Sequence, residues 1–269
     1  MKLDRNIAKR QAMKIRLAQN AAEVATAQRL RYRIFYEEMG ASPSSHNKAI
    51  QLDCDEFDAI CDHLLVIAPN ASDETTEFSL DDGELVGTYR LLQQSIAERH
   101  QGFYSQSEFD ITPLLERKSE LRFLELGRSC VSHEFRGTAV VELLWQGIWN
   151  YVRQHRLDVM IGCASFDGTD PGKHNEALSF LKQNVVTPSE WQVKAHQHNR
   201  VLIAARDCID NKRIISNLPP LIKGYLRLGS YISEDAVIDH NFNTTDILVV
   251  LPISAINPRY FAKFGSPTN

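Results

Sequence analysis

The fold is decided by residues 122–155, RFLELGRSCVSHEFRGTAVVELLWQGIWNYVRQH. The apolar run at 122–132 predicts a strand. Residues 138–155 predict a helix, because five apolar side chains recur at helical spacing on one face: Val141, Leu144, Trp145, Ile148 and Val152. A strand, a short turn and a long helix therefore follow one another in the middle of the chain.

Further elements are predicted on both sides of this segment. We expect strands at 13–19, 63–68, 84–93, 159–166 and 245–253, and helices at 21–40, 175–183 and 256–264. The polar stretches 41–51 and 70–84 predict loops, the second inside a hairpin. This order is typical of an α/β chain with a mixed sheet. We expect one domain over 1–269, with 190–240 as a lid or an added subdomain.

The composition is that of an ordinary globular protein. Hydrophobic residues are 43% of the 269 and charged residues 24%, so a core of normal size can form. The formal net charge of −4 argues against a nucleic-acid partner. No apolar run reaches the roughly 20 residues that span a bilayer. The five cysteines are spread out with no CxxC pair, which predicts reduced thiols, a cytoplasmic location and no metal site.

The turn before the long helix is the first candidate site. Arg136, Gly137, Thr138 and Ala139 stand where the strand ends and the helix begins. The first N–H groups of a helix are unpaired and carry partial positive charge, so they can hold a phosphate. Gly137 lets the backbone approach the anion, and Arg136 adds a charged donor. The alternative is an ordinary strand–helix turn with a surface arginine.

Two ionisable residues in the apolar strand form the second candidate site. Strand periodicity puts Glu125 and Gly127 on one face and Leu126 and Arg128 on the other. Ionisable groups inside an apolar strand are rarely left unpaired. In a functional interpretation, Glu125 is a general base and Arg128 is an orienting cation. In the alternative, structural interpretation, Arg128 forms a buried ion pair with a carboxylate such as Asp55 or Asp58.

The acidic segment at 53–62 is the third candidate site, with five acidic residues and no basic one. It is a pocket for a cationic substrate, or else a solvated loop. Arg31 and Phe35, on the preceding predicted helix, share a face because they are four residues apart. Arg31 is expected to bind one of the acids or a substrate carboxylate.

Several segments together resemble a known family. They include LDCDEFDAICDHLLV (52–66), LELGRSCV (124–131), RGTAVVELLWQGI (136–148) and DHNFNTTDILVVLP (239–252), and the similarity runs from about residue 13 to 265. The chain resembles the ornithine–acyl-carrier-protein N-acyltransferases of the Gcn5-related acetyltransferase superfamily. It is more distantly similar to the acyl-homoserine-lactone synthases. The tryptophan of those synthases is missing here, where Gly40-Ala41 stands, which fits a different amino substrate.

The resemblance implies a fold and a reaction. The fold is a mixed, mostly antiparallel central sheet flanked by helices. The reaction moves a (3-hydroxy)fatty acyl group from acyl carrier protein to the α-amine of L-ornithine, directly and without a covalent acyl-enzyme. The product is lyso-ornithine lipid. No cofactor is bound permanently, because the acyl-phosphopantetheine of the carrier protein is a co-substrate.

The resemblance also assigns roles to residues. Glu125 and Arg128 are catalytic, the residues at the helix start (Arg136, Gly137, Thr138, Ala139) bind phosphopantetheine, and the amino substrate is bound by five others: Arg31, Phe35, Asp55, Asp58 and Arg90. Arg136, Lys173, Lys223 and Arg227 are expected to dock the acidic carrier protein. The basic stretch at 1–16 is expected to touch the inner membrane peripherally.

Two alternatives to this function stay open at this point. One is another acyl-carrier-protein-dependent synthase, which makes a different N-acyl amino acid or a homoserine-lactone signal. The other is a regulator that only binds acyl carrier protein or lipid and does not catalyse a reaction.

Overall fold

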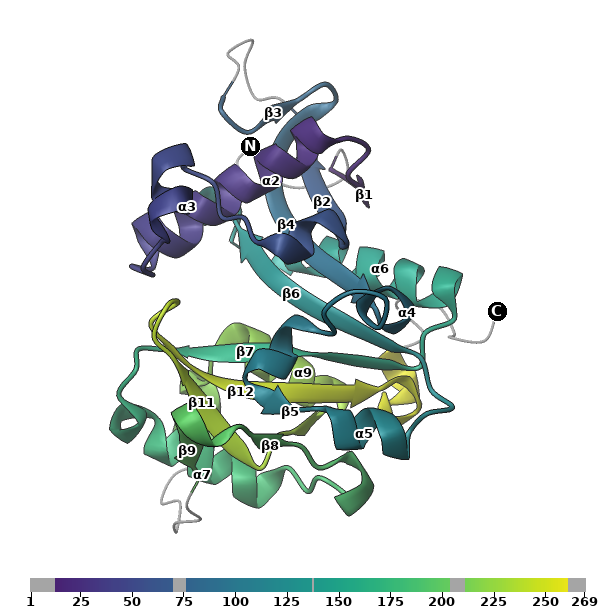
Figure 1. Cartoon of the computed structure of the whole chain (residues 1–269), viewed down its shortest axis with the longest axis vertical. Helices are drawn as coiled ribbons and strands as arrows, with labels where there is room; N and C mark the ends of the chain where they lie inside the picture. The colour runs from purple at the N-terminus through teal and green to yellow at the C-terminus, as the bar shows by residue number, and fades with distance from the viewer. Residues whose placement is uncertain (1–12, 70–75, 137, 204–210, 261–269) are drawn as a thin grey trace. The chain divides into compact units, whose positions relative to one another are not determined.

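A computed structural model describes residues 13–69, 76–136, 138–203 and 211–260 (Figure 1). The chain divides into two compact units. The first contains residues 1–92 and 126–155, and the second contains residues 93–125 and 156–269. The expectation of one domain over the whole chain stays a prediction. Among the described residues, no helix combines the length and the apolar character that crossing a bilayer requires.

The first unit contains a sheet in the order β1-β2-β4-β6, in which the pairings of β1 with β2 and of β2 with β4 are antiparallel. Its strands are β1 (Lys14–Leu17), β2 (Asp62–Ala68), β3 (Ser79–Leu80), β4 (Gly83–Gln93) and the later part of β6 (Phe123–Val131). β1 stands at the end of this order, which confirms the edge strand predicted at 13–19. β2 pairs with β4, with Leu65 opposite Thr88, so the predicted hairpin is also confirmed.

The first unit also contains helical segments. They are α2 (Ala21–Tyr32), the π-helix η1 (Arg33–Glu38), α3 (Ser45–Ile50) and α6 (Thr138–His155), with short 3-10 turns η2 (Glu56–Ala59) and η4 (His133–Phe135). Asn20 caps α2 by accepting a hydrogen bond from the Glu23 N–H. After η1, Gly40 has φ +75°, the left-handed conformation that ends helices.

The apolar side chains of β2 alternate between the two helical layers. Leu65 and Ile67 belong to a buried cluster with Ala27 and Leu30 of α2. On the other face, Leu64 and Ile15 approach Gly147 of α6 so closely that an added Cβ would lie 2.4 Å from Ile15 Cδ1. β2 is therefore buried on both sides, between α2 and α6 (Figure 1).

The buried face of α6 differs slightly from the predicted one. Leu144, Ile148 and Val152 are buried as expected. Val141 is 44% exposed, and its neighbour Val140 is buried instead. Counting back from Leu144, the four-residue spacing selects Val140, because side chains four apart lie on one face of an α-helix.

The second unit contains a sheet in the order β6-β7-β12-β11-β9. Its strands are the start of β6, β7 (Val159–Asp167), β9 (Arg200–Leu202), β10 (Tyr231–Ile232), β11 (Asp235–Asp239) and β12 (Thr244–Pro252). The pairing of β6 with β7 is parallel, and the pairings of β7, β12, β11 and β9 are antiparallel. A separate two-stranded sheet pairs β5 (Phe109–Asp110) with β8 (Lys194–Ala195).

The helices of this unit are short. They are α4 (Gln94–Ala97), α5 (Thr112–Arg117), α7 (Asn175–Asn184), α8 (Asn211–Asn217) and α9 (Pro220–Leu228). The 3-10 turns are η3 (Tyr104–Ser107), η5 (Pro171–His174), η6 (Ser189–Trp191), η7 (Gln197–Asn199), η8 (Ile253–Ala255) and η9 (Pro258–Tyr260). α9 packs against β7 and β12. The mixed α/β fold with mostly antiparallel pairing is confirmed.

Two predicted loops and one predicted helix need correction. Residues 41–51 contain α3, which Ser44 caps by accepting a hydrogen bond from the Asn47 N–H. Residues 76–84 contain β3, which pairs with the start of β4. The helix predicted at 256–264 is a single turn, η9, within the described part of the chain. Within 190–240, β9 and β11 join the sheet of the second unit, and a lid at this segment stays a prediction.

Candidate active site

Six charged side chains of the first unit form ion pairs that we call the Arg–Asp network: Arg31, Arg90, Arg128, Asp53, Asp55 and Asp58. Arg31 is almost fully buried, with 1% of its side chain exposed. Its Nη1 and Nη2 each donate to one Asp58 carboxylate oxygen at 2.9 Å, and its Nε donates to Asp53 Oδ2 at 2.8 Å. A full charge can be buried here because two carboxylates satisfy it.

Asp55 joins the other two arginines. Its Oδ1 accepts from Arg90 Nη1 at 2.6 Å, and its Oδ2 accepts from Arg128 Nη2 at 3.0 Å. Arg128 Nε also lies 3.3 Å from Asp53 Oδ2. The ion pair predicted for Arg128 is therefore present, with Asp55 as a partner. Asp55 and Arg128 are the most exposed members of the network, at 24% and 12% of their side chains.

The local sequence explains why the acids converge. Asp55 caps the 3-10 turn η2 by accepting from the Phe57 N–H, and Asp58 accepts from the Asp55 N–H. This reciprocal pair is a capping box. Asp53 and Asp58 are 2% and 8% exposed, so the solvated-loop interpretation of 53–62 is wrong for these two residues. The central guanidinium carbon of Arg90 lies over the Phe57 ring, 5.6 Å from the ring centroid.

The network keeps its acids ionised. Burial opposes the charged form of Asp53, yet Arg128 and Arg31 hold its pKa below the usual range. Burial likewise opposes ionisation of Asp58, and Arg31 and Arg90 hold its pKa low. Three guanidinium groups face three carboxylates, so the cluster has no net formal charge.

The π-helix presents a further side chain to the network beside Arg31. Phe35 was predicted to share a face with Arg31, four residues earlier. Phe35 packs against the apolar cluster that contains Leu30. Tyr36, five residues after Arg31, donates its hydroxyl to Asp53 Oδ1 at 2.9 Å. The i to i+5 spacing of a π-helix adds one residue to the turn, which accounts for the position of Tyr36 five residues after Arg31.

Glu125 lies in the second unit and is 5% exposed. Its carboxylate accepts hydrogen bonds from the backbone N–H groups of Tyr104 and Ser105, both at 2.8 Å, and from the Ser105 hydroxyl. The start of η3 therefore fixes the position of this carboxylate.

Arg128 has an unusual backbone conformation. Its φ is +50°, in the left-handed region that residues other than glycine rarely adopt. The regular strand alternation predicted from Glu125 to Arg128 ends at this residue. Such a conformation costs on the order of 1 kcal/mol and persists only where surrounding contacts hold it. The ion pairs with Asp53 and Asp55 supply those contacts.

The predicted phosphate-binding turn is only partly described. Arg136 ends η4 and donates to the Glu38 carboxylate and to the Val131 carbonyl. Gly137 lies outside the described residues, as does the side chain of Thr138, where α6 begins. Ala139 is half-buried in the first turn of α6. The phosphopantetheine role of these residues stays a prediction.

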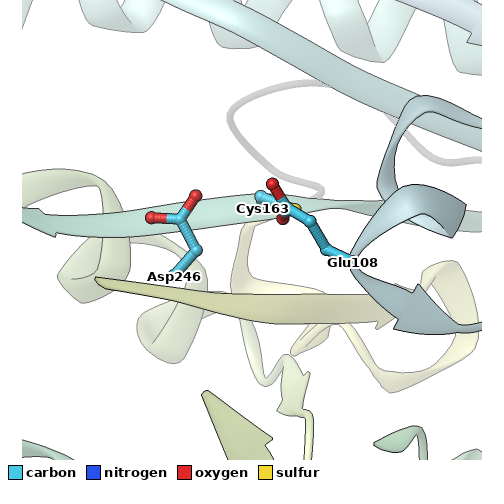
Figure 2. A group of neighbouring side chains, drawn as sticks. All are labelled: Glu108, Cys163 and Asp246. Atoms are coloured by element: carbon cyan, nitrogen blue, oxygen red, sulfur yellow. The ribbon is translucent and has the colours of Figure 1, made fainter. Parts of the chain in front are cut away.

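A separate cluster in the second unit brings together Glu108, Cys163 and Asp246 (Figure 2). One ligand atom from each lies within 4.8 Å of the others. The Cys163 thiol donates to Glu108 Oε2 at 3.2 Å. Burial, together with the charges of Glu108 and Asp246, raises the pKa of Cys163 well above its usual value. The thiol therefore stays protonated at neutral pH. None of the three was a predicted site residue.

The sequence reasoning identified five of the six network members and missed Asp53. Asp53 stands two residues before Asp55 in an acidic run, and this run gave no reason to single it out. Tyr36 was also missed, because no pattern in the sequence indicates a π-helix. Cys54, Cys61, Cys130 and Cys163 are free thiols, and Cys208 lies outside the described residues.

Comparison with known proteins identifies the class of the chain. Residues 30–146 match the acetyltransferase (GNAT) domain family. The chain also matches an N-acyl amino acid synthase from uncultured soil microbes, over 93% of this chain and 97% of that one, at 13% identity and a TM-score of 0.46. That structural similarity is too distant to support a functional argument. The chain is an acyltransferase with a GNAT domain.

Two relatives then specify the family. The L-ornithine N(alpha)-acyltransferase of Brucella abortus is 45% identical over 96% of this chain and 90% of its own length. The enzyme of the same name from Rhizobium meliloti is 47% identical over 94% of this chain and 84% of its own length. This chain belongs to the L-ornithine N(alpha)-acyltransferase family.

Proposed function

We propose that this protein transfers a (3-hydroxy)fatty acyl group from acyl carrier protein to the α-amine of L-ornithine, giving lyso-ornithine lipid. Membership of the L-ornithine N(alpha)-acyltransferase family carries the proposal. The Arg–Asp network supports it, because so many buried charges are costly and such clusters are typical of functional sites.

Glu125 is the proposed general base. The α-amine of an amino acid is mostly protonated near neutral pH, so a proton must leave before the nitrogen can attack. The nitrogen then bonds to the thioester carbonyl carbon, the C–S bond breaks, and the pantetheine sulfur leaves as a thiolate that takes up the proton lost by the nitrogen as the amide forms. Glu125 suits this role because the bonds from Tyr104 and Ser105 hold its carboxylate in place. Backbone N–H groups of the central strands are proposed to stabilise the developing oxyanion.

The Arg–Asp network is proposed to bind and orient the amino acid. Arg128 and Asp55 are the members with exposed surface, so they are the proposed contacts for the substrate carboxylate and the second amine. Arg31, Arg90 and Asp58 are more deeply buried and are proposed to hold Asp55 and Arg128 in position. Phe35 is proposed to act through packing, because it lies against the apolar cluster.

The donor is proposed to be an acyl-phosphopantetheine. The N-terminus of α6, with Arg136, Gly137, Thr138 and Ala139, is proposed to hold its phosphate. Arg136, Lys173, Lys223 and Arg227 are proposed to dock the carrier protein by opposite charge. Peripheral contact with the inner membrane is proposed for the basic N-terminal stretch, of which residues 1–12 lie outside the described ones.

The test is a mass-spectrometric assay of purified protein with 3-hydroxyacyl carrier protein, or with the matching acyl-coenzyme A, and one amino acid at a time. The expected result is acyl-ornithine made from the carrier protein, with the acyl group on the α-nitrogen by fragmentation. Product with a different amine would favour another N-acyl amino acid synthase. Binding of the carrier protein without product from any amine would favour the non-catalytic regulator.

A further inference from the structure

The hydrogen bonds of Tyr36 connect α3 with the Arg–Asp network. Its hydroxyl donates to Asp53 Oδ1, and the other Asp53 oxygen faces Arg31 Nε and Arg128 Nε. A hydrogen bond with the Asn47 side chain reaches Tyr36 from α3. Tyr36 therefore lies between α3 and the carboxylate that Arg31 and Arg128 share.

The π-helix is the reason that Tyr36 reaches this position. The Met39 N–H bonds to the Ile34 carbonyl at 3.0 Å, five residues back, where an α-helix would bond four residues back. π-helical turns are rare and frequent at functional sites. Here the turn packs Phe35 against the apolar cluster and presents Tyr36 to Asp53. The π-helix therefore places the Tyr36 hydroxyl against a carboxylate of the Arg–Asp network.

The Tyr36 hydroxyl is a donor under all ordinary conditions. Burial and the negative charge of Asp53 raise its pKa above the usual value of a tyrosine. Asp53 is ionised, so it accepts. A hydrogen bond between a neutral donor and a carboxylate is stronger than one between neutral groups, which makes it suited to fixing the direction of the Asp53 side chain.

We propose that Tyr36 is a positioning residue for acyl transfer: its hydroxyl fixes Asp53, and Asp53 holds Arg128 in the left-handed conformation in which Arg128 meets Asp55. The inference rests on the proposed function, in which Arg128 contacts the amino substrate. Tyr36 itself touches neither reacting group. Its effect on the reaction passes through Arg128.

Tyr36→Phe removes the hydroxyl and keeps the ring. Losing a hydrogen bond to a charged group is expected to lower kcat/KM for ornithine by about tenfold. Tyr32→Phe is the matched control, because it makes the same chemical change four residues earlier and Tyr32 makes no hydrogen bond to Asp53. It is expected to stay within about twofold of the wild type. Equal losses from the two variants would overturn the positioning role.

A double-mutant cycle separates positioning from a general loss of structure. In an Arg128→Lys background, Tyr36→Phe is expected to change kcat/KM by less than about twofold, because the guanidinium on which it acts is absent. A tenfold loss in both backgrounds would show that Tyr36 acts independently of Arg128 and would overturn the inference.

A readout without turnover keeps this inference distinct from the proposed function. In the wild type, the NMR signal of the Arg128 Nε–H is expected to exchange slowly with water, because Arg128 Nε is buried against Asp53. Tyr36→Phe is expected to accelerate that exchange about tenfold or more, and Tyr32→Phe is not. Unchanged exchange in Tyr36→Phe would refute the positioning role even if the protein acylates ornithine. Accelerated exchange would support it even if ornithine is not the acceptor.

Discussion

Arg31 and Asp58 face each other through two parallel hydrogen bonds of 2.9 Å, with 1% and 6% of their side chains exposed. Arg31 comes from α2 and Asp58 from the 3-10 turn η2, so this bidentate pair joins the helix to the acidic segment. Geometry of this kind is specific to arginine, because the planar guanidinium matches the two carboxylate oxygens. The pair is therefore central to both stability and the site.

Arg31→Lys is expected to destabilise the protein by about 3 kcal/mol or more, because a lysine cannot satisfy Asp53 and Asp58 together. The measurement is the free energy of unfolding in urea. Arg29→Lys is the control on the same helix, where the arginine makes an exposed bond to the Glu77 carbonyl. It is expected to change the free energy by no more than about 0.5 kcal/mol. Similar effects from both would refute a special role for the buried pair.

Acid is expected to weaken the fold through Asp53 and Asp58. Both have a folded pKa below the unfolded value of about 3.9, so their contribution is complete above that value and is lost as the pH falls. The thermal unfolding midpoint should therefore drop below about pH 5. Asp58→Asn should be less stable at pH 7 and should show a shallower drop. Parallel pH profiles would contradict this assignment.

His63 is expected to make the stability of the fold depend on pH in a second, higher pH range. Burial lowers its folded pKa, with Arg31 and Arg90 opposing the charged form. The unfolded chain therefore takes up a proton first, at a pKa of about 6.5, and stability falls as the pH drops through about 7 to 5. His63→Gln keeps a donor for the Asp58 carbonyl, which His63 Nε2 contacts at 3.1 Å. The variant should lose the slope in this range, as followed by unfolding at each pH.

Glu125→Gln is expected to lower kcat by about a hundredfold or more if Glu125 is the base. It should also lower the unfolding temperature. The glutamine side chain replaces one carboxylate oxygen with an NH2 group, which cannot accept the hydrogen bond that a backbone N–H of Tyr104 or Ser105 donates at that position. Ser105→Ala separates the two effects, since it removes only the hydroxyl and leaves both backbone bonds. Its kcat should stay within about threefold. Full activity of Glu125→Gln would remove Glu125 as the base.

Gly83→Ala is expected to destabilise the first unit strongly. A Cβ at Gly83, whose φ is +146°, would lie 2.2 Å from the Ala68 carbonyl oxygen, so β2 would have to move. We expect a loss of about 2–4 kcal/mol in the free energy of unfolding. Gly40→Ala is the control that measures the effect of a positive φ alone. Gly40 has φ +75°, and no atom lies within 4 Å of the added Cβ. Its loss should be about 1 kcal/mol.

The elements with strong periodicity were predictable from the sequence, and those set by irregular backbone were not. The helix at 138–155 was predicted with the bounds that α6 has, because four-residue spacing is a local property of the chain. α3 was missed because it has only six residues, most of them polar, and its signal is a cap at Ser44. The π-helix was missed because an α-helical pattern and a π-helical pattern look alike over a few residues.

The sequence by itself determined the fold class, the order of the main strands and helices, and the segments from which the site is built. These follow from hydrophobic periodicity and from residue types, which act over a few neighbours. Only the tertiary structure decided that Arg31 pairs with Asp53 and Asp58, and that Tyr36 donates to Asp53. These contacts and the ion pair of Asp53 with Arg128 join residues up to 75 positions apart, and burial makes an unpaired charge so costly that the fold must bring the partners together.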